Sequence, residues 1–415
     1  MKMACAPAAG ARSSGGDVPK IARGDAVALT RELVRVDSRN PTLVSGAPGE
    51  ARAAHLLADV LTSWGFRVEL REAAPGRPNV IARAGSAQAQ HGAPSLLFNG
   101  HIDVVGVEGM AHAPWDGVER DGRIYGRGAT DMKAGVAAMC AAAVRAVDTR
   151  GDAGGLNGEI ILTAVVDEEY SSIGTRALIT DGIRADAAIV TEPTRLAIMP
   201  AHKGFVWVDV LVHGRAAHGS RWDVGVDAIR HAGLLLAELD RYDAEILPVR
   251  DHPLLGRPSL HASTITGGIG LSTYPDRCHF TIERRTIPGE TTAEVLAEMQ
   301  GACDRVRQRR PELSVDLGLI FEQPPSDVST DAPIVRALEG ALRACAEEVR
   351  ITGMSAWTDA ALLNEAGIPA ICFGPGDISL AHAAEEYVRI DEIERATLVL
   401  AALAVRWMDT NRNAA

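Results

Sequence analysis

The chain has 415 residues, of which 47% are apolar and 23% are charged, a composition typical of a globular protein. This length is too great for one ordinary hydrophobic core and predicts two domains. The net charge of −12 argues against nucleic acid or an anionic membrane as the main partner, and no apolar stretch reaches the roughly 18 residues of a membrane span.

The first residues are rich in alanine, glycine and serine and contain no continuous apolar segment. We therefore expect residues 1–22 to form a mobile tail rather than a signal peptide. The six cysteines are scattered and include no CxxC pair, which indicates neither a zinc knuckle nor a disulfide framework. We expect reduced and mostly buried thiols in a cytoplasmic protein.

Apolar residues at helical spacing predict two helices near the start, within 25–38 and 51–65, the second ending at Gly65. Short apolar strands then alternate with helices. The predicted strands are NVIARA (79–84), SLLFN (95–99), EIILTAVV (159–166) and DAAIV (186–190), and the predicted helices lie at 132–147 and 175–180. This alternation predicts an α/β domain with a mostly parallel sheet that is covered on both faces.

From about His202 the pattern changes. The predicted order is a strand (204–214), a helix (225–242), two strands (259–268 and 277–286), a helix (292–308) and a strand (313–321). The order β-α-β-β-α-β is that of a ferredoxin-like α+β unit. After Gln323 the α/β pattern returns with a helix from 332, a strand near 368–372 and a final helix. We predict one domain made of 23–199 and 323–415, interrupted by a second domain at 200–322.

Potential metal ligands collect where the predicted strands end. They are His101 and Asp103 after SLLFN, Asp167, Glu168 and Glu169 after EIILTAVV, Glu192 after DAAIV, His382 after AICFGPG, and Asp131 just before a helix. In open α/β sheets, functional sites lie beyond the carboxyl ends of the strands. Two histidines and several carboxylates, without cysteine, suit zinc or a similar divalent ion, and their number suits two ions.

Each of these residues also has an ordinary structural explanation. A strand-end histidine or glutamate is often solvated, and Asp131 could be the N-cap of a helix that starts at Met132. The segment GRGATD (126–131) lacks the third glycine of a dinucleotide loop and the lysine of a P-loop, so it indicates nucleotide binding only weakly. Ligand candidates at several separate strand ends favour a metal site. Residues two apart on an extended chain point the same way, so Asp103 can orient His101.

With these motifs the chain resembles the M20 metallopeptidase family, and within it the acetylornithine deacetylase and succinyl-diaminopimelate desuccinylase branch. The resemblance runs from about Leu29 to the C-terminus. Its motifs are FNGHIDVV, DGRIYGRGATDMKAG, DEE, TEPT, HGRAAHGS, RRTIPGE and FGPGD followed by AHAAEEYV. It implies a zinc-exopeptidase-like catalytic domain and an inserted ferredoxin-like lid that mediates formation of a homodimer.

The resemblance also implies a set of metal ligands. His101, Asp131 and Glu192 would surround one metal ion, and Asp131 would bridge to a second ion held by Glu169 and His382. Two zinc ions are expected, with cobalt or manganese as alternatives.

Further roles follow from the same resemblance. Glu168 would be the general base, and Asp103 would orient His101. His218 in HGRAAHGS would reach the active site of the partner subunit; its alternative is a residue that caps the following helix. Arg285 and Gly374 would bind the substrate, although an arginine at position 285 could also be an ordinary surface residue.

The implied reaction is metal-dependent hydrolysis of a small N-acylated amino acid or a related amine. Glu192, where peptidase-type members tend to have aspartate, favours a deacylase. The alternatives are a di- or tripeptidase, an N-formyl or N-carbamoyl amide hydrolase and, more remotely, a non-catalytic metal-stabilised scaffold, which the presence of Glu168 disfavours. Residues 272–274 (STY) depart from the Asn-Val-Ile-Pro pattern that is frequent in the family, so acetylornithine itself is not implied.

Overall fold

A computed structural model describes residues 20–85, 93–151 and 156–409. Most of the predicted tail, residues 1–19, therefore lies outside the described part of the chain. Within the described ranges, no helix combines the length and the apolar character needed to cross a membrane.

In the described residues, nine strands form one large sheet. Its order is β1-β2-β6-β3-β7-β15-β8-β13, with β14 also paired to β8. The strands are β1 (Arg67–Ala74), β2 (Arg77–Gly85), β3 (Ser95–His101), β6 (Glu159–Val165), β7 (Ala187–Val190), β8 (Ile198–His202), β13 (Ser326–Asp327), β14 (Ile351–Met354) and β15 (Ala370–Cys372). The central strands β6, β3, β7 and β15 run parallel, as predicted, whereas β1, β2 and β8 add antiparallel pairs beside them.

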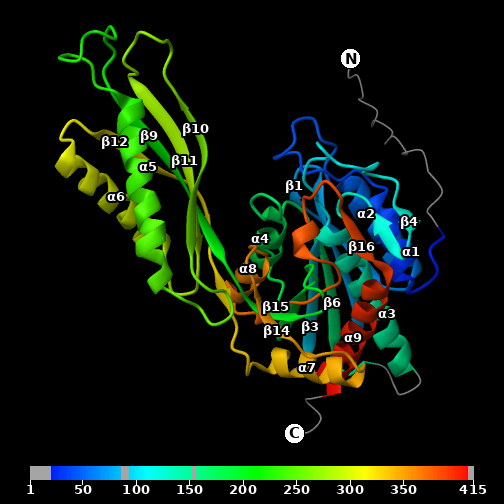
Figure 1. The fold of residues 1–415 in the computed structure, drawn as a ribbon. Helices are drawn as coiled ribbons and strands as arrows, with labels where there is room; N and C mark the ends of the chain where they lie inside the picture. The colour runs from blue at the N-terminus through cyan, green and yellow to red at the C-terminus, as the bar shows by residue number, and fades with distance from the viewer. Residues whose placement is uncertain (1–19, 86–92, 152–155, 410–415) are drawn as a thin grey trace, which may run out of the picture.

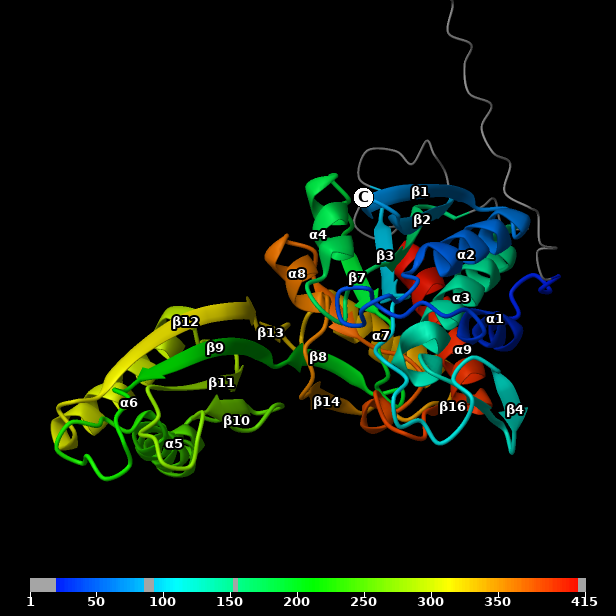
Figure 2. The ribbon, with the colours of Figure 1, turned by 90° about the horizontal axis from the view of Figure 1, so that it is seen from above.

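Helices cover both faces of this sheet (Figures 1 and 2). One face carries α2 (Ala51–Ser63), α3 (Ala134–Gly151) and α9 (Ile390–Asp409), with α1 (Ala26–Val34) and α7 (Pro333–Ala344) packed beside them. The other face carries α4 (Ile173–Thr180) and α8 (Ala360–Glu365). The predicted apolar stripe of α2 is buried, since Leu57, Leu61 and Trp64 are at most 3% exposed. Gly65 ends this helix with a left-handed φ of 92°, a conformation that suits glycine.

The ferredoxin-like unit has the predicted order of elements. It contains β9 (Gly204–His213), α5 (Ala228–Glu245), β10 (Ser259–Gly267), β11 (Arg277–Thr286), α6 (Thr292–Arg309) and β12 (Ser314–Gln323). Its antiparallel sheet has the order β10-β11-β9-β12. Alternate valines of β9, such as Val208 and Val210, pack with α5 and α6 in a separate hydrophobic core. In Figure 1, both helices lie on the side of this sheet that faces away from the large sheet.

Two short connections join the large sheet to the ferredoxin-like unit. β8 ends at His202 and β9 begins at Gly204, while β12 ends at Gln323 and β13 begins at Ser326. A Cβ atom at position 204 would collide with the backbone nitrogen of Pro325, so glycine lets the two connections lie side by side. The domain limits drawn from the sequence remain a prediction.

The remaining described elements are small. β4 (Val118–Arg120), β5 (Arg123–Tyr125) and β16 (Tyr387–Arg389) form a separate sheet beside the carboxyl end of the large one. Short helical turns occur at η1 (Ala129–Lys133), η2 (Leu247–Val249) and η3 (Ile378–Leu380).

Candidate metal centre

The candidate ligands meet beyond the carboxyl ends of the parallel strands. His101 is the last residue of β3, while Glu168 and Glu169 follow β6 and Glu192 follows β7. These strands are neighbours in the sheet, so their ends place the side chains close together. Asp131 joins them from η1, the turn that precedes α3.

Asp131 lies between two histidines. Its Oδ1 is 3.1 Å from Nε2 of His101, and its Oδ2 is 3.5 Å from Nε2 of His382. The same nitrogen of His382 is 2.9 Å from Oε2 of Glu169. The Asp131 carboxylate thus turns one oxygen towards each of the two imidazoles.

The ligand atoms form two overlapping groups that share His101. One group adds Asp131 and Glu169, the other adds Glu168 and Glu192, and in each group the atoms lie within 4.8 Å of one another. Donors bound to one tetrahedral zinc ion are roughly 3.4 Å apart. The observed separations therefore fit a divalent cation after small side-chain movements, and imidazole and carboxylate donors suit zinc, cobalt or manganese.

Burial makes this group of carboxylates electrostatically unfavourable without a cation. It raises the pKa values of Glu168 and Glu192 well above the usual carboxylate range, and neighbouring acids raise them further. Burial also opposes the charge of His101, but the hydrogen bond to Asp131 and nearby carboxylates raise the pKa of His101 well above its usual value. Divalent cations would neutralise this excess of negative charge.

Asp103 contacts His101 through its backbone carbonyl, whereas the sequence suggested a contact through its side chain. Nδ1 of His101 donates to the backbone carbonyl of Asp103 at 3.0 Å, whereas the nearest carboxylate oxygen is 3.6 Å away. The carboxylate instead accepts hydrogen bonds from the backbone nitrogens of Glu168 and Glu169 at 3.1 and 3.2 Å. Asp103 therefore orients His101 mainly through its main chain, because its side chain is engaged by the segment after β6.

The capping alternatives do not hold. The helix after η1 begins at Ala134 rather than Met132, and the Asp131 carboxylate contacts the two histidines. The N-cap of α5 is Asp227, whose side chain accepts a hydrogen bond from the backbone nitrogen of Arg230. His218 therefore does not cap that helix.

His218 is exposed and lies in the loop after β9. Its Nδ1 is 2.8 Å from Oγ of Ser220. The loop that follows β10 lies against it, since Tyr274 donates from its backbone nitrogen to Ala217 and Thr273 pairs with His218. The segment with the unusual sequence at 272–274 and His218 thus form one surface.

The two residues expected to bind substrate have defined contacts. Arg285 pairs with Glu283, and its guanidinium lies 5.2 Å from the centre of the Phe205 ring. Its neighbour Arg284 is fully buried and pairs with Glu290, so the two arginines point to opposite faces of β11. Gly374 is buried, and a Cβ atom there would collide with the carbonyl oxygen of Thr191.

Two buried acids near the ligands were not anticipated from the sequence. Oε1 of Glu386 accepts hydrogen bonds from the backbone nitrogens of Thr130 and Asp131 at 3.1 and 3.3 Å. Asp359 accepts a hydrogen bond from Thr175 at 2.6 Å, and burial raises the pKa of Asp359 to about 6. The motif AHAAEEYV contains Glu386, so only this residue had a signal in the sequence.

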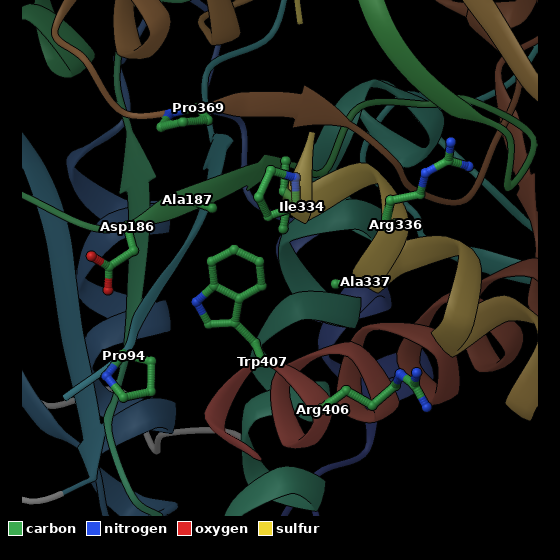
Figure 3. A pocket seen from close by; sticks show the side chains of 10 residues that line it. Pro94, Asp186, Ala187, Ile334, Arg336, Ala337, Pro369, Arg406 and Trp407 are labelled. Carbon is green, nitrogen blue, oxygen red and sulfur yellow. The ribbon is translucent and has the colours of Figure 1, made fainter. Parts of the chain in front are cut away.

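A separate cavity of about 650 Å³ lies at the amino ends of the parallel strands, opposite the end that carries the candidate ligands (Figure 3). Pro94, Asp186 and Pro369, which line it, immediately precede or adjoin the amino ends of β3, β7 and β15. The rings of Trp407 and the prolines give it a partly apolar wall. Because the candidate ligands stand at the other end of these strands, this cavity is not part of the metal centre.

Comparisons with known proteins place most of the chain among peptidases and deacylases by similarity. Residues 97–406 match the model of peptidase family M20/M25/M40. The chain is 30% identical to an acetylornithine deacetylase from Myxococcus xanthus, over 90% of this chain and 95% of that protein. It is 29% identical to N-formyl-4-amino-5-aminomethyl-2-methylpyrimidine deformylase from Bacillus subtilis, over 85% and 88% of the two chains.

Solved structures share the fold. A metallo-carboxypeptidase of the M20 family from Sulfolobus solfataricus aligns with a TM-score of 0.74, 18% identity and coverage of 92% of this chain and 99% of that one. A dinuclear metal-binding peptidase of the same family from Bacillus subtilis aligns with a TM-score of 0.68, 16% identity and coverage of 92% and 96%. Both alignments extend over the large sheet and the ferredoxin-like unit.

Proposed function

The chain belongs to peptidase family M20/M25/M40, and from that premise we propose that it removes the acyl group from an N-acyl amino acid or a related N-acyl amine. The observation that carries this proposal is the position of Asp131 between His101 and His382, with Glu168 beside them. The relatives from Myxococcus xanthus and Bacillus subtilis support it, because one is a deacetylase and the other removes a formyl group from an N-formyl compound.

We assign the ligands of two divalent ions, with zinc as the expected metal. His101, Asp131 and Glu192 would hold one ion, and Glu169 and His382 would hold the other, with Asp131 between them. When bound, such ions would polarise the scissile carbonyl and lower the pKa of a bound water molecule. Glu192 is 3% exposed and His382 is half exposed, so the second ion would lie on the open side of the centre.

Glu168 is the group that would move the proton. Its Oε2 is 3.8 Å from Nε2 of His101, and its side chain is only 10% exposed. Glu168 would accept a proton from the attacking water and then deliver it to the nitrogen of the departing amine. Breaking the amide bond thus leaves a carboxylic acid, which contains the oxygen of the water, and a free amine, which contains the proton that Glu168 took from it.

A second candidate is hydrolysis of an N-formyl group on an amine that carries an aromatic ring. Only 4% of the residues are aromatic, yet five of them gather where the ferredoxin-like unit meets the large sheet: Tyr170, Phe205, Trp207, Phe321 and Trp357. Tyr170 follows Glu169 directly and stacks on Phe321 with ring centres 6.2 Å apart. A flat heteroaromatic substrate would find stacking partners beside the metal centre.

We also propose that the protein is a homodimer formed through the ferredoxin-like unit, with His218 acting in the partner's site. β10 is an edge strand whose residues from His261 to Gly267 are exposed. The adjoining loop exposes Ile269 and Leu271. An exposed edge with apolar side chains is a surface on which a second copy of the strand can pair.

A cytoplasmic location is part of the proposal. The described cysteines at positions 140, 278, 303, 345 and 372 are free thiols, four of them buried. Free thiols suit a reducing compartment. A test is the oxidation state of the cysteines in protein isolated with rapid alkylation, since disulfides would contradict this location.

The test of function is release of free amine from N-acetyl, N-succinyl and N-formyl amino acids, N-formyl aminomethylpyrimidines and dipeptides. Each substrate is assayed with zinc- or cobalt-loaded protein, after chelation, and with Glu168→Gln as the matched control. Metal-dependent cleavage of acylated amino acids supports the first candidate, and cleavage of the pyrimidine formamide alone supports the second. Cleavage of dipeptides alone would overturn both and identify a peptidase, and inactivity on every substrate would favour a scaffold.

A further inference from the structure

Behind the metal centre lies a buried polar cluster that no comparison assigns. We propose that Asn40, supported by Arg77, is a positioning residue that fixes the direction of Glu168 and Glu169 through two intervening carboxylates, Asp103 and Asp167. The inference rests on the proposed function of the metal centre, because Glu168 and Glu169 are its assigned base and ligand.

The chain reverses at Asp167, and this reversal turns the next two residues into the centre. Asp167 has a φ of 68°, a left-handed conformation that is uncommon for residues other than glycine and is tolerated best by asparagine and aspartate. Its carboxylate holds the turn, because Oδ2 accepts from the backbone nitrogen of Ser171 at 3.2 Å and from Oγ of Ser171 at 2.5 Å. Asp167 is 1% exposed, so its remaining oxygen also needs a donor.

Asp103 holds the main chain just beyond the turn. One carboxylate oxygen accepts from the backbone nitrogen of Glu168 and the other from that of Glu169. Asp103 is fully buried, so its carboxylate has no solvent to accept from. A buried carboxylate keeps its charge and its position only when further donors compensate it.

Asn40 supplies a donor to both acids with a single amide group. Its Nδ2 donates to Oδ2 of Asp103 at 2.9 Å and to Oδ1 of Asp167 at 3.0 Å. Its Oδ1 accepts from the backbone nitrogen of Thr42 at 2.9 Å, which fixes the orientation of the amide. The two hydrogens of the Asn40 amide nitrogen therefore hold the carboxylates of Asp103 and Asp167 in fixed positions relative to each other.

Arg77 balances the charge of the cluster. It pairs with Glu50, and its Nη1 lies 2.9 Å from Oδ1 of Asp167. Its Nη2 also donates to Oδ1 of Asn40 at 3.3 Å. One guanidinium thus ties β2 to the segment before α2 and to the turn after β6, and it leaves the amide nitrogen of Asn40 free to face the acids.

The test compares Asn40→Ala and Asn40→Asp with Asn364→Ala. Asn40→Asp keeps the size of the side chain but replaces its donor with an acceptor. Asn364 is the matched control, because its amide bonds to the backbone of Ala370 at 2.8 and 2.9 Å at the other end of the sheet. The readouts are metal affinity by competition with a chromophoric chelator, the visible absorption spectrum of the cobalt-loaded protein, kcat and KM, and the unfolding midpoint in urea.

For both Asn40 variants we expect metal affinity and kcat to fall about 10- to 100-fold, a shifted cobalt spectrum, and a KM changed by less than about threefold. Asn364→Ala should lower the urea midpoint without moving the spectrum. The proposal would be overturned if Asn40→Ala and Asn364→Ala lowered the urea midpoint equally while the Asn40 variants kept the metal affinity and the cobalt spectrum of the wild type.

Two safeguards separate the possible failures. If the Asn40 variants do not fold, Arg77→Lys is the second variant, because it replaces the branched guanidinium with a single ammonium group at a partly exposed position. We expect metal affinity, kcat and the cobalt spectrum to change in the same direction as in the Asn40 variants, but by less. An unchanged affinity and spectrum in folded Arg77→Lys would then overturn the proposal. Metal affinity and the cobalt spectrum need no substrate, so they test the positioning role even if the proposed reaction is wrong.

Discussion

His218 and Thr273 face each other as an isolated antiparallel bridge between two loops of the ferredoxin-like unit. The loop with the unusual sequence at 272–274 is therefore attached to the histidine proposed to act in the partner subunit. If the histidine reaches the other active site, this loop reaches it too. The choice of substrate by this protein would then depend in part on residues supplied by the neighbouring subunit.

Mixing two inactive variants tests this arrangement. His218→Ala and Glu168→Gln should each be nearly inactive as homodimers. A mixed dimer contains one site with an intact base and, from the other chain, an intact histidine, so each mixed dimer should have about half of the activity of a wild-type dimer. The measurement is activity after co-refolding, with mixed dimers counted by native mass spectrometry. Mixed dimers without activity would show that His218 does not act across the interface.

Glu168→Gln should separate proton transfer from metal binding. The amide cannot accept the proton of the attacking water, so we expect kcat to fall about 100- to 10,000-fold. Metal content should stay at the wild-type level, because five other ligands remain. The measurements are kcat and inductively coupled plasma mass spectrometry, and a variant that kept the wild-type kcat would show that another group is the base.

Removing single ligands should change metal stoichiometry in a graded way. Glu169→Ala should lose one of the two ions, because it removes the partner of His382. Asp131→Ala should lose most of both, because its two oxygens face both histidines. Glu348→Ala, an exposed glutamate on the surface, is the matched control. Equal metal content in all three variants, measured after dialysis against dilute chelator, would contradict the ligand assignment.

His202 should make stability depend on pH. Burial lowers the pKa of His202 to about 4, from an ordinary value of 6.5. Because the folded-state pKa is the lower one, the unfolded chain binds more protons between these values. The free energy of unfolding should therefore fall as the pH drops from about 6.5 towards 4, by up to about 3 kcal/mol.

Urea unfolding of wild type and His202→Phe at several pH values between 7 and 4.5 measures this contribution. His202 packs edge-on against Trp357 with ring centres 6.2 Å apart, so phenylalanine preserves the shape of the site. The variant should lose less stability on acidification, whereas His55→Phe on the exposed side of α2 serves as the control. Parallel curves for wild type and His202→Phe would assign the acid sensitivity to other groups.

Much of the candidate centre was predictable because the carboxyl ends of neighbouring parallel strands all lie on the same side of the sheet. A histidine or acid that follows an apolar run at SLLFN, EIILTAVV or DAAIV must lie on that side, whatever the loops do. Asp131 and His382 come from turns instead: their places just before a helix and after AICFGPG made them candidates, and the resemblance of their motifs to a family gave them their expected roles. The ferredoxin-like order was predictable from the alternation of strand and helix patterns.

The cluster behind the centre was not predictable from local pattern. Asn40 contacts Asp103 and Asp167 across 63 and 127 positions, and no periodicity reports a contact of that range. Short strands were missed for another reason. β13 has two residues and β8 includes Pro200, so neither shows a sustained apolar alternation. Their pairing depends on neighbours that are already in place.

All of the assigned ligands precede Gly204 or follow Gln323, and within residues 20–85, 93–151 and 156–409 the chain passes between the two units only at these points. The segment from 204 to 323 could thus be exchanged for that of a relative without replacing any assigned metal ligand, while replacing His218, Arg285 and the loop at 272–274. Such a graft carries one requirement. The incoming segment should begin with glycine, because a Cβ atom at 204 would collide with the backbone nitrogen of Pro325 where the two connections lie side by side.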